Sequence, residues 1–162
     1  MFVHFPIALL TVYAILELVR LKKLRGNETW LFVKAVPLVI GFLGAIIALK
    51  TGETAQKIIG RSQLIRIHSS WAETATYIFG FLALIYALTI VDRYFGRSIS
   101  EKLGSGSTLD GISREIFKFA STIQSSPLMV LAALAGRAAI TVTGALGGAI
   151  VYGPNTDPVV KF

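Results

Sequence analysis

The chain contains no cysteine and few charged residues, and both absences narrow what it can be. Without cysteine it can form no disulfide, no thiolate or iron–sulfur site and no covalent haem linkage. Any metal or haem must therefore be held by His, Met or oxygen ligands. Charged residues make up only 15% of the 162 residues, whereas 54% are hydrophobic. This composition is far more apolar than that of a soluble domain, and it predicts a membrane protein.

Acidic residues are scarce as well: 9 Asp and Glu stand against 16 Lys and Arg, for a net charge of +7. The basic residues cluster at the ends of apolar runs, where they set topology and meet lipid head groups. We therefore expect membrane lipid as a partner and no nucleic acid. The sequence shows no nucleophile–base arrangement, phosphate loop or paired carboxylates, so we do not expect an enzyme.

Four apolar runs predict an all-α fold, an integral membrane four-helix bundle with up-down-up-down topology. We expect the spans at about residues 2–19, 30–49, 68–91 and 127–152, in one domain that covers residues 1–162. Ser126 followed by Pro127 predicts the start of the last span. Residues 98–107 predict a linker, and residues 109–124 predict an amphipathic helix in the membrane interface. The first run lacks the basic flank and the cleavage site of a signal peptide.

The expected connections differ in charge, which predicts the orientation. The first and third connections carry nine Lys and Arg, and the opposite side carries five. The positive-inside rule therefore favours a multi-pass protein with both termini on the outer side of the membrane.

The chain has only two histidines, His4 and His68, and each precedes an apolar run. An ionisable side chain in or beside a span is a candidate functional group. The first and third helices of the expected bundle run in the same direction, so we expect both rings near the outer face. If those helices are diagonal neighbours, the two imidazoles can ligate a central metal from opposite sides.

Small side chains near the histidines predict space for a flat cofactor, since a core of protein alone would favour Leu and Ile. We expect this cofactor to be haem, with propionates near the basic residues of the same membrane face. Alternatively, small residues reflect close helix packing in lipid, and the basic residues anchor head groups. The predicted cofactor-binding residues, besides the two histidines, are Ala8, Thr11, Ala72, Ala75, Gly144, Gly147, Gly148, Arg61 and Arg66.

Four charged residues fall within the expected spans, and one of them, Lys34, interrupts the second apolar run near its start. Glu17 and Arg137 lie at similar expected depths, so we predict that they form an ion pair, with a proton or substrate path as the alternative. Glu73, one turn after His68, could orient its ring or face solvent.

The opening His4-Phe5-Pro6-Ile7-Ala8-Leu9 resembles the signature of an uncharacterised prokaryotic membrane family, domain-of-unknown-function family 2231. The segments 51–55 and 144–152 and the position of His68 fit the same family. The resemblance implies a four-helix domain of the prokaryotic cytoplasmic (inner) membrane. Some relatives look joined to Rieske-type iron–sulfur domains, which suggests electron transfer.

Together these patterns predict a small b-type cytochrome that binds one haem b between His4 and His68, both as metal ligands. It would pass electrons to other membrane subunits or redox partners. If only one histidine binds, a chlorophyll-type macrocycle or a five-coordinate haem becomes possible. The competing hypothesis is a cofactor-free accessory subunit of a membrane complex. A transporter built on Glu17 and Arg137 is a weaker third hypothesis, because a pair of broken helices is lacking.

Overall fold

A computed structural model describes residues 4–19, 27–59, 62–103 and 107–153. The secondary structure of these residues is helical throughout, which confirms the all-α class. Three of the helices are long and apolar enough to cross a membrane: α2, α3 and α5. The first, α1, has 15 residues and is shorter. The five helices are α1 (His4–Leu18), α2 (Glu28–Ile59), α3 (Gln63–Leu103), α4 (Thr108–Ser125) and α5 (Pro127–Tyr152).

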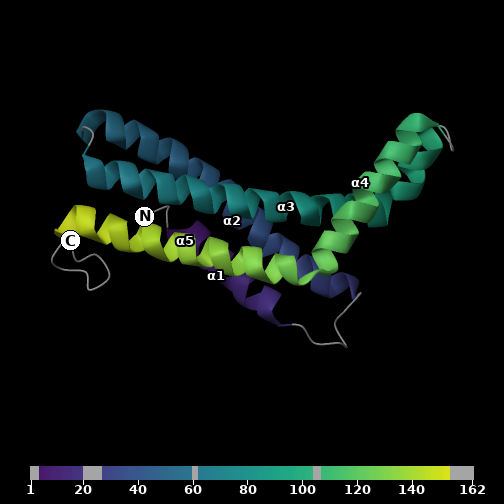
Figure 1. The fold of residues 1–162 in the computed structure, drawn as a ribbon, viewed down its shortest axis with the longest axis horizontal. Coiled ribbons are helices and arrows are strands. Elements are labelled where there is room, and N and C mark those ends of the chain that lie inside the picture. Colours follow the sequence, from purple (N-terminus) through teal and green to yellow (C-terminus); the bar gives the residue numbers. More distant parts are fainter. Residues whose placement is uncertain (1–3, 20–26, 60–61, 104–106, 154–162) are drawn as a thin grey trace.

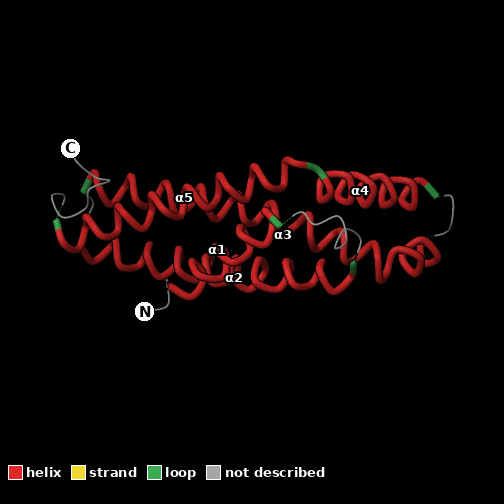
Figure 2. Tube along the Cα trace, turned by 90° about the horizontal axis from the view of Figure 1, so that it is seen from below, coloured by secondary structure: helices red, strands yellow, loops and turns green. Residues whose placement is uncertain are grey.

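Helices α1, α2, α3 and α5, which we call the bundle helices, pack along one another, and α4 departs from them at one end (Figure 1). The predicted up-down-up-down bundle across a membrane stays a prediction. Seen from below, α4 continues the line of the bundle beside the end of α3 (Figure 2). A band of large apolar side chains fills the core between the four bundle helices. Its most buried members include Leu10, Tyr13, Leu38, Phe79, Leu82, Tyr86 and Met129.

Glycines hold the bundle helices close together. A Cβ atom at Gly41 would lie 2.9 Å from Leu10, and one at Gly44 would lie 3.1 Å from Pro6. At Gly80 and Gly136 it would lie 2.8 Å from the ring of Phe42 and of Phe79, respectively. Such close approach is how helices pack in lipid. These contacts also fix the register, with the first turn of α1 beside Gly44 of α2.

That register leaves one end of the bundle without α1. From Gly44, which packs on Pro6, α2 continues to Ile59, a rise of about 22 Å at 1.5 Å per residue. The described part of α1 begins at His4. Beyond it, only α2, α3 and α5 continue among the described residues.

Two helices run past their predicted ends. The predicted exit of the second span, residues 51–53, is helical, and the hydroxyls of Thr51 and Thr54 donate to main-chain carbonyls one turn earlier. Helix α3 continues to Leu103 through part of the predicted linker 98–107. The predicted helix start at Ser126–Pro127 is confirmed.

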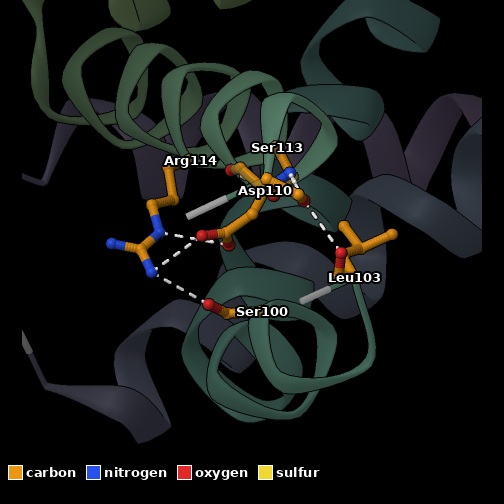
Figure 3. A network of polar contacts seen from close by, with 6 residues as sticks. Ser100, Leu103, Asp110, Ser113 and Arg114 are labelled. Atoms are coloured by element: carbon orange, nitrogen blue, oxygen red, sulfur yellow. Dashed lines mark hydrogen bonds and ion pairs between the residues drawn. The ribbon is translucent and has the colours of Figure 1, made fainter. Parts of the chain in front are cut away.

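The predicted amphipathic helix 109–124 is present as α4, and it packs against the end of α3. Figure 3 shows the contact: Arg114 pairs with buried Asp110 on its own helix, at 2.9 Å, and its Nη2 donates to Ser100 of α3 at 2.9 Å. The apolar stripe of α4 faces away from the protein, since Leu109, Ile112, Ile116 and Phe119 are all exposed. Its position in a membrane interface stays a prediction.

Candidate functional site

An apolar cleft of about 530 Å³ lies between the bundle helices near the end that α1 does not reach. All four bundle helices contribute to its wall, with Pro6, Ile7 and Leu10 from α1. Many of the residues that line the cleft are small, and small side chains leave space between helices that the larger side chains of a Leu-rich core would fill. The small residues of the wall are Ala45, Ala48, Gly52, Ala55, Ala72 and Ala75.

His68 on α3 places an imidazole in the wall of this cleft. Its Nδ1 lies 2.9 Å from the main-chain carbonyl oxygen of Thr143 on α5. Because a carbonyl oxygen only accepts, Nδ1 carries the proton and donates. In the neutral ring Nε2 is then the unprotonated nitrogen, and no described residue hydrogen-bonds to it. Imidazoles that ligate metals in proteins are commonly held in this way.

Gly147 of α5 makes this contact possible. A Cβ atom at this position would lie 3.3 Å from Cε1 and 3.7 Å from Nδ1 of His68. The ring therefore lies in space that a side chain would occupy, and it reaches the carbonyl of Thr143 one turn earlier. A Cβ atom at Gly144, on the same helix, would meet nothing within 4 Å.

A polar pocket of about 480 Å³ adjoins the cleft, because Gln56 and Ser69 line both. Arg66 supplies a positive charge to its wall and Glu73 a negative one. Glu73 is exposed and accepts a long hydrogen bond of 3.5 Å from Ser69. Of the two roles that the sequence left open for Glu73, the structure shows the exposed one, and the Thr143 carbonyl instead accepts the hydrogen bond from His68.

The structure brings the α3 part of the predicted site together. Ala72 and Ala75 line the cleft with His68. On α5, Gly147 contacts the ring, whereas Gly144 is exposed and Gly148 is half-buried, and neither is in the described wall. Arg61 lies outside the described residues.

The α1 part of the predicted site lies elsewhere. His4 and Ala8 are exposed, Thr11 is half-buried, and none of the three is in the described wall of the cleft. At 100° per residue this face of α1 is about 150° from the face of Pro6 and Leu10 that lines the cleft.

His4 and His68 also differ in level. Pro6 packs on Gly44, and Phe42 packs on Gly80, which places His4 beside about residue 76 of α3. His68 lies eight residues before that position on α3, a distance of about 12 Å along the helix at 1.5 Å per residue.

The predicted pair of Glu17 and Arg137 is wrong. Glu17 is 2% exposed, and its Oε2 accepts from Nζ of Lys34 at 3.1 Å and from the hydroxyl of Tyr86 at 2.6 Å. Glu17 reaches Lys34 because Lys34 lies in the second turn of α2, beside the end of α1. Arg137 instead donates to the hydroxyl of Thr141 on its own helix.

Two elements of this geometry escaped the sequence analysis. The acceptor for His68 is a main-chain carbonyl, which has no side-chain signature; Gly147 four residues later was the available signal. Lys34 was read only as an interruption of its apolar run. In the described ranges, no three His, Cys, Asp or Glu side chains gather as a metal site.

Comparison with known proteins adds no family. No family model matches the chain, and no curated protein or solved structure matches it. The resemblance to domain-of-unknown-function family 2231 stays a prediction.

Proposed function

We propose that this chain is a membrane protein that binds one haem b in the apolar cleft, with His68 as an axial ligand, and that it transfers electrons. The observation that carries the proposal is the hydrogen bond from Nδ1 of His68 to the carbonyl of Thr143. It leaves Nε2 as the basic nitrogen on a ring that lines an apolar cleft. Haem supplies one-electron chemistry when bound.

The wall of the cleft supports an amphipathic ligand with a flat apolar ring. Its small side chains leave space between α2, α3 and α5, and the adjoining polar pocket offers Arg66 to carboxylates. This pairing of apolar and polar pockets matches the macrocycle and propionates of haem. A chlorophyll-type macrocycle, which also takes one axial imidazole, is the alternative cofactor.

His4 is our candidate for the second axial ligand. The offset of about 12 Å along the bundle means that α1 would have to move before both rings could meet one iron. With His68 alone, the haem would be five-coordinate. We therefore rest the site on His68 and test His4 separately.

Titration of the purified protein with haemin tests the proposal. We expect one haem per chain for the wild type, loss of binding in His68→Ala, and retention in the control Gly144→Ala, where an added methyl group meets nothing. A change of the Soret and α bands in His4→Ala would identify a second ligand. Equal haemin binding by wild type and His68→Ala would refute the site.

The second candidate is a cofactor-free accessory subunit of a membrane complex. The exposed apolar stripe of α4, formed by Leu109, Ile112, Ile116 and Phe119, favours it. On this hypothesis His68→Ala has no spectral effect. Assembly into a larger species on native gels would instead depend on α4.

A further inference from the structure

Arg137 lies near the middle of the apolar part of the bundle. Its neighbour Gly136 packs on the fully buried ring of Phe79. From Phe79, the Tyr86 that binds the Glu17–Lys34 pair is about 10 Å away along α3. Towards the opposite end of the bundle, the nearest charged residue of α2 is Lys50. It lies about 12 Å along that helix from Phe42, which packs on Gly80. Arg137 is thus distant from the charged residues at both ends.

The guanidinium of Arg137 is poorly satisfied at this depth. Its one hydrogen bond to a described residue goes to the hydroxyl of Thr141, which itself donates to the Arg137 carbonyl at 2.9 Å. A guanidinium has five N–H donors. In the described part of the chain, no carboxylate lies within ion-pair distance of it. A charge so placed against lipid is costly unless a partner binds it.

The face of α5 beside Arg137 suits a second helix. Ala138, Thr141 and Gly144 are exposed on this side of the helix, and a Cβ atom at Gly144 would meet nothing within 4 Å. Small exposed side chains let another helix approach closely in lipid. The small residues alone would carry no conclusion, but beside them lies Arg137, a half-buried cation level with the middle of the apolar helices, which pairs with no carboxylate of the described residues.

We propose that this face of α5 binds a transmembrane helix of another membrane subunit, and that this helix carries an Asp or Glu at mid-depth to pair with Arg137. A second copy of this chain does not supply that group. Glu17 is already paired with Lys34 and Tyr86. Among the other described acidic residues, Glu73 is exposed and lies about 9 Å along α3 from Phe79, and Glu53 is exposed in the last turns of α2, so neither is level with Arg137.

A designed helix can serve as the probe. A Leu-rich peptide of about 22 residues would carry Glu, Gln or Leu at its centre and a fluorescent acceptor, and would be mixed in lipid vesicles with the donor-labelled full chain. We expect energy transfer to show about three- to tenfold tighter association of the Glu peptide than of the Leu peptide. Arg137→Leu should abolish this preference. The control Arg97→Leu, at an exposed position near the end of α3, should leave it unchanged.

Equal association of the Glu and Leu peptides, or a preference that survives Arg137→Leu, would overturn the proposal. A photo-crosslinking amino acid at position 138 in native membranes gives a second readout. A crosslink to an apolar segment that contains Asp or Glu, lost in Arg137→Leu, supports the proposal. A crosslink only to another copy of this chain contradicts it.

Discussion

Two glycines one turn apart on α5 have opposite surroundings, and this difference yields a paired test. In Gly147→Ala, the new methyl group would lie 3.3 Å from Cε1 of His68 and would displace the ring from the Thr143 carbonyl. We expect haem affinity, measured by haemin titration, to fall about 10- to 100-fold, as when the partner of a ligating histidine is lost. Gly144→Ala is the matched control. Equal affinities would show that the position of the ring does not matter.

The buried ion pair at the other end of the bundle is expected to be sensitive to single changes. Lys34→Met leaves Glu17 buried without its cation, and we expect a loss of about 3–5 kcal/mol in the free energy of unfolding in micelles. The double variant Glu17→Leu with Lys34→Met should recover most of it.

Lys50→Met is the control for that measurement. Lys50 pairs with Glu53 at 3.5 Å, but both side chains are more than half exposed, so we expect a change below about 1 kcal/mol. If Lys34→Met proves as stable as Lys50→Met, then the pair does not hold α1 to α2.

Single residues were predictable where their type is rare. With two histidines in the chain, His68 was an evident candidate, and its helical spacing gave Ala72 and Ala75. The partner of Glu17 was not predictable, because it depends on which helix lies beside α1. Lys34 was nearer along the chain than Arg137, and the short connection between α1 and α2 brings their ends together.

At the scale of elements, the end of α3 and α4 form a unit held by polar contacts. Asp110 is 1% exposed, and its carboxylate pairs with Arg114 on the same helix (Figure 3). Its main-chain carbonyl accepts a hydrogen bond from the hydroxyl of Ser113. In Asp110→Ala, we expect faster hydrogen exchange of the α4 amides and no change in α5. Glu115→Ala, at an exposed position of the same helix, is the control. Unchanged exchange in α4 would mean that apolar contacts alone hold it.

The existence of the five helices was more predictable than their ends. Apolar runs and the cap at Ser126–Pro127 place α5 as expected. The polar residues after the predicted span 30–49 and those at the start of the predicted linker 98–107 suggested that the helices end there. In the structure they are helical, as parts of α2 and α3. In α2, the hydroxyls of Thr51 and Thr54 donate hydrogen bonds to main-chain carbonyls of the same helix. These polar side chains are therefore satisfied within the helix and do not end it.

At the scale of the molecule, the absence of cysteine makes topology directly measurable. Ser70 and Lys102 are exposed near opposite ends of α3. We expect Ser70→Cys to react with a membrane-impermeant maleimide in intact spheroplasts, and Lys102→Cys to react only after permeabilisation. The reverse pattern would invert the predicted orientation. Reaction of both from outside would show that α3 does not cross.

The cleft itself could not be predicted from the sequence. It lies where the described part of α1 begins, level with Gly44, so that among the described residues the ends of α2, α3 and α5 extend past α1. The sequence instead predicted that the first and third spans start at one level, and from that came the expectation that His4 and His68 meet.

The optical spectrum of the protein purified from its native membrane tests the central claim most directly. With His68 as an axial ligand of haem b, the reduced-minus-oxidised spectrum should show haem bands that are absent in His68→Ala and present in Gly144→Ala. A featureless trace for the wild type, or identical bands in wild type and His68→Ala, would contradict the account.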